Sequence, residues 1–469
     1  MRQLTQRGAS TSERGVDLQV GSPFFASRRW QRALGRPVLF GDVRRMLFLI
    51  AQYGQTFVVS LLDYGGTFLS SSVGVELSTM RGLVNRSQRR PVEAGCRSVI
   101  VEYMTTPLHS TVTLSDPSEV LAAVPHLLGF HPTNSFVLVT VHGSRRMSRI
   151  DLALRTDLPE PANHRRFVEH LADGPVQNNK ADAVMLFVIG GVDAPEERDG
   201  ESPSPPSKST EDTGSPPYVE LIEVAREVLF RAGIMVIHAL WTPEIRSDNA
   251  WLCYDDPDCR GILPDPKSSS VAAALAAAGS VTFDSRAELK ALIAPESDEM
   301  LARRAAKLDV LSEEAERERG VPSGNGQRDL DIVLSAVARV AEGAALTEDD
   351  LLRVLLALSD SRVRDIALST AFGESAAAAE QLWLDLVRKA PPPELADVGA
   401  LLAVAGYLRG DGALAGVVLE RIEEVRPDHR LGALLRKALD LGIAAGELKV
   451  IVRDAVEDAR TLLDEEADW

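Results

Sequence analysis

The sequence predicts an α/β domain, whose mixed sheet contains a parallel crossover and an edge hairpin, followed by an all-α domain. Three observations support this fold class. Helical and strand patterns alternate between residues 114 and 241, two of the strands are apolar on both faces, and the chain beyond residue 330 carries Ala and Leu at helical spacing between short turns.

Residues 1–103 are predicted to lie outside this fold. They contain 14 Arg, no Lys and 7 acidic residues, without helical or strand periodicity. Because arginine codons can be rich in G and C, this composition resembles translated GC-rich DNA upstream of a gene. We therefore expect the native start at Met104, with residues 1–103 an artefact of gene prediction or a disordered extension. A genuine N-terminal domain is the alternative.

The first predicted element is a helix after Asp116. Asp116 can cap it, Pro117 suits its first position, and Gly129 suits its C-cap. An apolar stripe runs along one side and is formed by Val120, Leu121, Val124, Leu127 and Leu128. Pro125 lies inside this stripe and is expected to kink the helix or to restart it.

Strands and helices then alternate. Residues 135–141 and 149–158 read as the two strands of the edge hairpin. Residues 164–174 and 218–233 read as helices, and 181–191 and 234–241 as buried strands. Because both of these strands are apolar on both faces, the strand–helix–strand unit around residues 218–233 is predicted to be a right-handed parallel crossover.

A segment rich in Pro, Ser and acidic residues, about 193–217, interrupts this unit. It cannot bury enough apolar area to order itself, so a disordered insertion is expected. Since it leaves the carboxyl end of a strand, where α/β sheets often bind ligands, a lid over a site is the alternative.

The C-terminal part is predicted to be helical throughout. Residues 297–320 form a charged helix, and the Gly-containing stretch 321–329 separates an α/β domain at 110–320 from a helical domain at 330–469. The stretches "LLALSDSRVRDIAL" and "LLAVAGYLRGDGAL" are similar, which indicates repeated helix pairs. Leucines, alanines and a proline in the second copy lie at positions that resemble tetratricopeptide spacing: Leu402, Ala403, Ala415, Leu419 and Pro427.

Several stretches resemble one family. "LSDPSEVLAAVPHLLGFHPTNSFVLV", "HALW", "WLCYDDPDC", "SSSVAAALAAAGS" and "SRAEL" are similar to the DUF4192 family of actinobacterial proteins, whose function is unassigned. The resemblance runs from about Leu114 to the C-terminus. It implies paired cysteines followed by proline after an Asp-Pro turn, whereas here Arg260 and Gly261 follow Cys259. The family implies no catalytic residue.

The candidate metal ligands are Cys253 and Cys259, which lie in "WLCYDDPDCRG" beside Asp255 and Asp256. The two thiols could bind a metal, with His238 as the further zinc-type ligand nearby, or form a redox-sensitive pair. A plain acidic turn is the alternative.

The candidate ligand-binding residues are His126, His131, Asp255 and Asp256. The two histidines flank the Gly-Phe turn after the first helix, and the alternative is that they are simply packed or solvated. The sequence has no nucleophile elbow, P-loop or zinc-protease motif, so catalytic residues and cofactors stay unknown.

Charge and cysteine content limit the partners. The net charge is −17, and residues 104–469 carry −24, so nucleic acid is not expected as a partner. The apolar run 46–62 is interrupted by polar residues, so no membrane span is expected. Three scattered cysteines indicate a cytoplasmic protein.

Two function classes follow. The leading hypothesis is a non-enzymatic interaction or regulatory protein whose helical domain binds a protein partner. A purely structural role for that domain is the alternative. The rival hypothesis is an enzyme or ligand-binding protein with a site near residues 253–259. A deep pocket converging on His126, His131, Asp255 and Asp256 would favour the rival.

Overall fold

The computed structural model describes residues 101–105, 110–114, 116–144, 147–191, 215–277, 279–319 and 325–467. The predictions for residues 1–100 and for most of the insertion at 193–217 lie outside the described residues. The expected start at Met104 and the two domain limits stay predictions.

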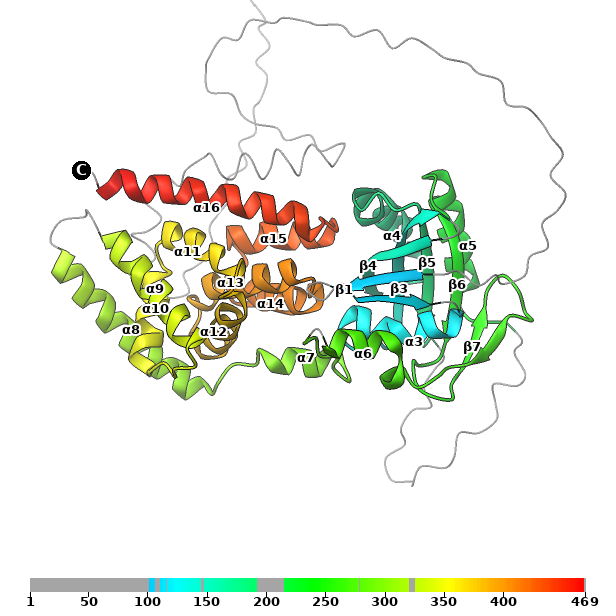
Figure 1. Ribbon diagram of the computed structural model, residues 1–469, viewed down its shortest axis with the longest axis horizontal. Coiled ribbons are helices and arrows are strands. Elements are labelled where there is room, and N and C mark those ends of the chain that lie inside the picture. Colours follow the sequence, from blue (N-terminus) through cyan, green and yellow to red (C-terminus); the bar gives the residue numbers. More distant parts are fainter. Residues whose placement is uncertain are drawn as a thin grey trace, which may run out of the picture. The chain divides into compact units, whose positions relative to one another are not determined.

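The described residues form one mixed sheet of eight strands in the order β2-β1-β4-β3-β5-β6-β7-β8 (Figure 1). The strands are β1 (Val101–Thr105), β2 (Ser110–Leu114), β3 (Ser135–Ser144), β4 (Met147–Asp157), β5 (Ala183–Ile189), β6 (Met235–Thr242), β7 (Ala250–Cys253) and β8 (Arg260–Ile262). β5 and β6 pair in parallel, and α5 (Val219–Arg231) lies between them in the chain, which confirms the predicted crossover.

The hairpin of β3 and β4 forms as predicted but does not lie at the edge of the sheet. β3 pairs with β5 on its other side, and β4 pairs in parallel with β1. The edges are instead β2 and β8. The prediction was wrong on this point because β1 begins at Val101, in a segment that was expected to lie outside the fold.

Helix α3 (Pro117–Leu128) has the predicted ends. The Ser118 N–H donates to Asp116 Oδ1 over 2.7 Å, and Gly129 ends the helix with a φ of 77°. A left-handed φ costs glycine little because it has no Cβ. Of the two outcomes expected at Pro125, a kink or a restart, the restart does not occur, because one helix runs through this residue; Pro125 is buried.

Helices cover both faces of the sheet (Figure 1). α3 and α6 (Ser270–Ala277) lie on one face, and α4 (His164–Leu171) and α5 on the other. Side chains alternate along β5, so Met185 and Phe187 pack toward α3, whereas Leu186 and Val188 pack toward α4 and α5. This explains why every residue of β5 is buried.

The C-terminal part is helical, which confirms the predicted fold class. After α7 (Arg286–Leu292), its helices are α8 (Asp298–Arg319), α9 (Asn325–Ala341), α10 (Glu348–Ala357), α11 (Ser361–Ala367), α12 (Ala376–Lys389), α13 (Leu395–Arg409), α14 (Gly412–Val425), α15 (Arg430–Asp440) and α16 (Ala445–Ala467). α13 is apolar on nearly all sides and is buried from Leu395 to Tyr407, so it forms the centre of this core.

A buried ion cluster joins α11, α13 and the loop between α14 and α15. Asp397 on α13 accepts hydrogen bonds from Arg364 Nη1 at 2.8 Å and from His429 Nε2 at 3.2 Å, and Arg426 lies at 3.5 Å. His429 also caps α15, since its Nδ1 accepts from the Gly432 N–H at 3.1 Å. The carboxylate is 5% exposed, so its partners compensate a charge that water cannot reach.

Candidate functional site

The two candidate histidines of the α/β domain line one hollow. It has a volume of about 280 Å³ and lies between the end of α3 and the alanine face of α6. The lining residues are His126, His131, Lys267, Ala272, Ala273, Ala276, Ser280, Thr282 and Asp284. The structure therefore brings His126 and His131 together, as their positions around one turn indicated.

His126 has a structural role there. Its Nε2 lies 2.8 Å from the Pro266 carbonyl, which can only accept, so Nε2 is the donor. Its Nδ1 lies 2.8 Å from Thr282 Oγ1 and in the neutral ring accepts from that hydroxyl. Burial lowers the pKa of His126, which favours this neutral form. Both ring nitrogens are thus used to join α3 to two distant loops.

The other polar residues of the hollow carry little net charge. Burial, together with the neighbouring His126, lowers the pKa of His131. Lys267 Nζ lies 3.4 Å from Asp284 Oδ1, and both side chains are more than two-thirds exposed. An exposed pair of this kind contributes little energy and holds a ligand weakly.

Asp255 and Asp256 lie away from this hollow. Asp255 pairs with Arg226 of α5, which covers the opposite face of the sheet from α3. Asp256 shapes the turn between β7 and β8, because its Oδ1 accepts from the Asp258 N–H at 2.9 Å. The four candidate ligand residues therefore form two separate pairs, and this hollow does not converge on all four.

The two candidate metal ligands flank the same turn. The Cys253 N–H donates to the Cys259 carbonyl at 3.0 Å, and Cys253 carries a buried thiol, so the two are not joined by a disulfide. Burial raises the pKa of the Cys253 thiol and keeps it protonated, which disfavours metal binding and nucleophilic attack. Within the ranges that the structure describes, no three His, Cys, Asp or Glu side chains are grouped as a metal site.

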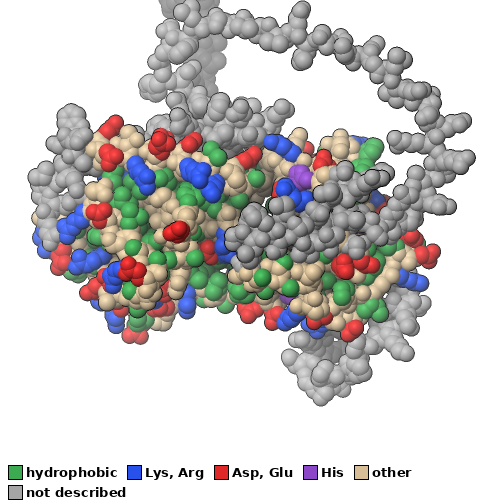
Figure 2. Space-filling view, in the orientation of Figure 1, with side chains coloured by type: hydrophobic (Ala, Val, Ile, Leu, Met, Phe, Trp, Pro, Cys, Tyr) green, Lys and Arg blue, Asp and Glu red, His purple; other side chains and the backbone are tan. Residues whose placement is uncertain are grey.

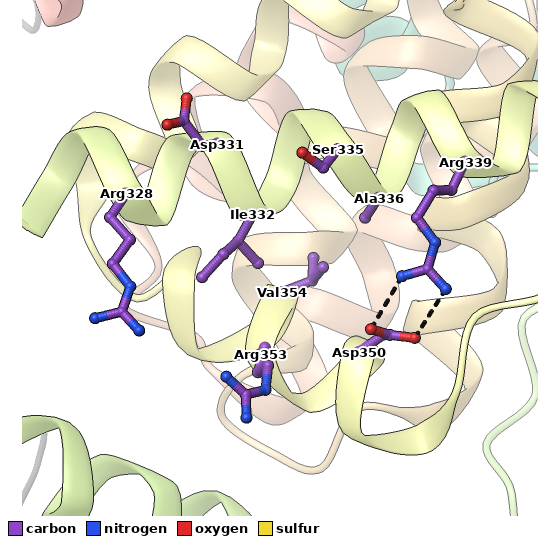
Figure 3. Close-up of a pocket in the computed structure, with 9 residues that line it drawn as sticks. All are labelled: Arg328, Asp331, Ile332, Ser335, Ala336, Arg339, Asp350, Arg353 and Val354. Carbon is purple, nitrogen blue, oxygen red and sulfur yellow. Dashed lines mark hydrogen bonds and ion pairs between the residues drawn. The ribbon is translucent and has the colours of Figure 1, made fainter.

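A second hollow lies in the helical domain, between α9 and α10, and we call it the α9–α10 groove. Its volume is about 300 Å³. It is lined by Arg328, Asp331, Ile332, Ser335, Ala336, Arg339, Asp350, Arg353 and Val354 (Figure 3). On α9 the lining residues recur at spacings of three and four, so they share one helix face.

The two ends of the groove differ in charge. At one end Arg339 and Asp350 form two parallel contacts of 3.0 and 3.1 Å, which neutralise both groups. The hydrogen bonds from Arg339 and from Thr347, the N-cap of α10, keep the pKa of Asp350 well below its usual range. This end is a fixed structural pair.

At the other end two cations are available. Arg328 and Arg353 extend from α9 and α10 toward the same side, with Ile332 between them (Figure 3). Both side chains are exposed, and neither makes an ion pair or side-chain hydrogen bond within the described part of the chain. Asp331 is held by Gln327 at 3.1 Å and points away from them (Figure 3).

Sequence reasoning missed the α9–α10 groove. Arg328, Ile332 and Arg339 share one helix face, and this spacing was the available signal. The pairing of that face with α10 depends on tertiary packing. The face of the helical region seen in Figure 2 mixes both charge signs with apolar side chains, so composition alone does not single out the groove.

The fold defines a class, a two-part protein in which an α/β sheet precedes a helical region. Residues 117–445 match the model of a domain of unknown function (DUF4192), which is more than half of the chain, so the protein belongs to this family. This agrees with the resemblance noted in the sequence. No curated protein and no solved structure matches the chain. Among the described helices, none has the length and apolar character that crossing a membrane requires.

Proposed function

We propose that this protein is a non-enzymatic interaction protein whose helical domain binds an acidic segment of a partner protein in the α9–α10 groove. The observation that supports this proposal is the pair Arg328 and Arg353, which lie on either side of Ile332. Both are exposed, and within the described residues neither has an acidic partner. An arginine presents a planar set of donors that matches a carboxylate. On a chain of net charge −17, such a local cationic pair selects acidic partners.

The floor of the groove specifies a second feature of the partner. Ile332, Ala336 and Val354 supply apolar surface between the charged ends. A volume of about 300 Å³ accommodates a single large apolar side chain. The expected partner segment therefore carries one apolar residue flanked by Asp or Glu. The repeated helix pairs, with their tetratricopeptide-like spacing, are in keeping with such a binding domain.

The test measures binding of a fluorescein-labelled peptide of alternating glutamate and leucine to the full chain. The double variant R328E/R353E replaces two attractions by two repulsions. Since one exposed ion pair contributes roughly 0.2–1 kcal/mol, the affinity is expected to fall about tenfold. Binding of the native protein should also weaken with added salt.

A matched variant controls for net charge. R430E/R460E changes two exposed arginines on α15 and α16, outside the groove, by the same total charge. It should bind the peptide like the native protein, and the lysine-for-glutamate peptide should not bind. Equal losses in both double variants would show a general charge effect and would refute the groove as the binding site.

A further inference from the structure

The carboxyl end of the parallel pair β5 and β6 contains two buried polar atoms that the fold leaves without partners. The first is Thr156 Oγ1 on β4. Thr156 is the cross-strand neighbour of Phe136, whose ring contacts Phe167 of α4 edge-on at 5.4 Å. Because directly opposite residues share a face of the sheet, Thr156 lies on the α4 side.

The second atom is His164 Nε2. His164 is the first residue of α4 and precedes Phe167 by one turn, so the two side chains share a helix face. His164 is 6% exposed, and within the part of the chain that the structure describes its Nε2 has no hydrogen-bond partner. A buried polar group without a partner costs about 1–3 kcal/mol. Two such groups on the same side of the sheet indicate that a bound ligand supplies their missing hydrogen bonds.

The N-terminus of α5 lies beside His164. The N-cap of this 13-residue helix is Tyr218, whose ring centroid is 6.5 Å from that of His164. The side chain of Tyr218 does not cap the helix, and the first N–H groups form the positive end of the helix dipole.

The neighbouring residues hold this helix start in place. Tyr254 Oη donates to the Pro217 carbonyl at 2.6 Å. Gly191 lies so close to the Tyr218 ring that a Cβ there would be 2.5 Å from it, and Tyr218 itself has a φ of 61°. The start of α5 is thus fixed against the end of β5.

We propose that Thr156, His164 and the N-terminus of α5 form a binding site for a small oxyanion, either a phosphate or a carboxylate. The Thr156 hydroxyl on β4 and the His164 imidazole N–H on α4 donate to the anion, and α5 supplies backbone N–H groups. The site lies at the carboxyl end of parallel strands, where open α/β sheets bind ligands. It is separate from the α9–α10 groove, and of residues 253–259 only Tyr254 supports it, through its hydrogen bond to Pro217.

The test follows the histidine side-chain nitrogens of the ¹⁵N-labelled full chain by NMR during titration with inorganic phosphate, and separately with acetate. The Nε2 resonance of His164 is expected to move and saturate at millimolar ligand, while that of His170, exposed on the same helix, stays in place. Saturation by phosphate alone indicates a phosphate ligand, and saturation by acetate alone indicates a carboxylate ligand.

Variants then test each contact. T156V removes the hydroxyl with little change of shape, and H164L removes the imidazole, so each should weaken binding at least tenfold. H164Q keeps an N–H donor and should bind within a few-fold of the native protein, as should H170L. The proposal is overturned if neither anion shifts His164 up to about 10 mM. It is also overturned if T156V binds like the native protein, because the two atoms then enclose only a void or a water.

Discussion

A buried polar cluster in the helical part and a buried polar pair in the α/β part differ in whether their atoms have partners. In the helical part, the Asp397 carboxylate accepts from Arg364 and His429, and the cluster joins α11, α13 and the loop between α14 and α15. In the α/β part, Thr156 Oγ1 and His164 Nε2 are buried without partners. A saturated cluster holds the fold together, whereas unmet atoms at a sheet end point to a ligand.

The largest expected effect comes from removing the charge at the centre of the saturated cluster. D397N leaves the buried Arg364 guanidinium with less compensation, so the free energy of unfolding should fall by about 3–5 kcal/mol. Urea unfolding followed by far-UV circular dichroism measures this. D428N, at a carboxylate that is 87% exposed, is the control and should change little. A loss below about 1 kcal/mol for D397N would mean that the cluster does not stabilise the helical part.

A smaller effect is expected from acid. Burial by itself would raise the pKa of Asp397, but the hydrogen bond from His429 and the charge of Arg364 outweigh it and lower the pKa to about 2. Because the folded pKa lies below the unfolded value of about 3.9, the cluster stabilises the protein above pH 4, and this contribution is lost as the pH falls toward 2.

This contribution is on the order of 2 kcal/mol. The stability advantage of the native protein over D397N should therefore shrink between pH 4 and pH 2. Parallel unfolding series of the two proteins across this range measure it. An advantage that is independent of pH would contradict the role assigned to the Asp397 charge.

The smallest expected effect concerns the buried Thr156 hydroxyl of the α/β part. T156V replaces an unpartnered hydroxyl by a methyl group of the same shape, so without added anion the free energy of unfolding should stay the same or rise by up to about 1 kcal/mol. Thermal unfolding in an anion-poor buffer measures this change. A clear loss of stability would mean that the hydroxyl has a partner in solution and that the comparison fails at this position.

Local signals predicted much of the fold. The cap at Asp116, the C-cap at Gly129 and the apolar run of β5 depend on neighbours within a few residues, and all three are confirmed. The parallel crossover followed from strands that are apolar on both faces, and it is confirmed as well. The position of the β3–β4 hairpin depended on which strand pairs with β4, and that partner, β1, has no strong pattern of its own.

The candidate sites were harder to predict. His126 and His131 surround one turn, so their proximity could be inferred, yet the use of both His126 nitrogens depends on Pro266 and Thr282, which lie far along the chain. Asp255 was grouped with the histidines as a candidate ligand-binding residue, and the pairing with Arg226 puts it on the other face of the sheet.

The sequence by itself determined the central strands β3 to β6, their helices, the fold class and the membership of the DUF4192 family, because caps, hydrophobic periods and family patterns are short-range properties of the chain. Only the tertiary structure decided which polar groups have partners. Among the described residues, Arg328 and Arg353 have no ion-pair partner whereas Asp397 has several, because of which helices and loops meet at those places. A hydrogen bond or ion pair requires atoms within a few ångströms, and that proximity is a property of packing.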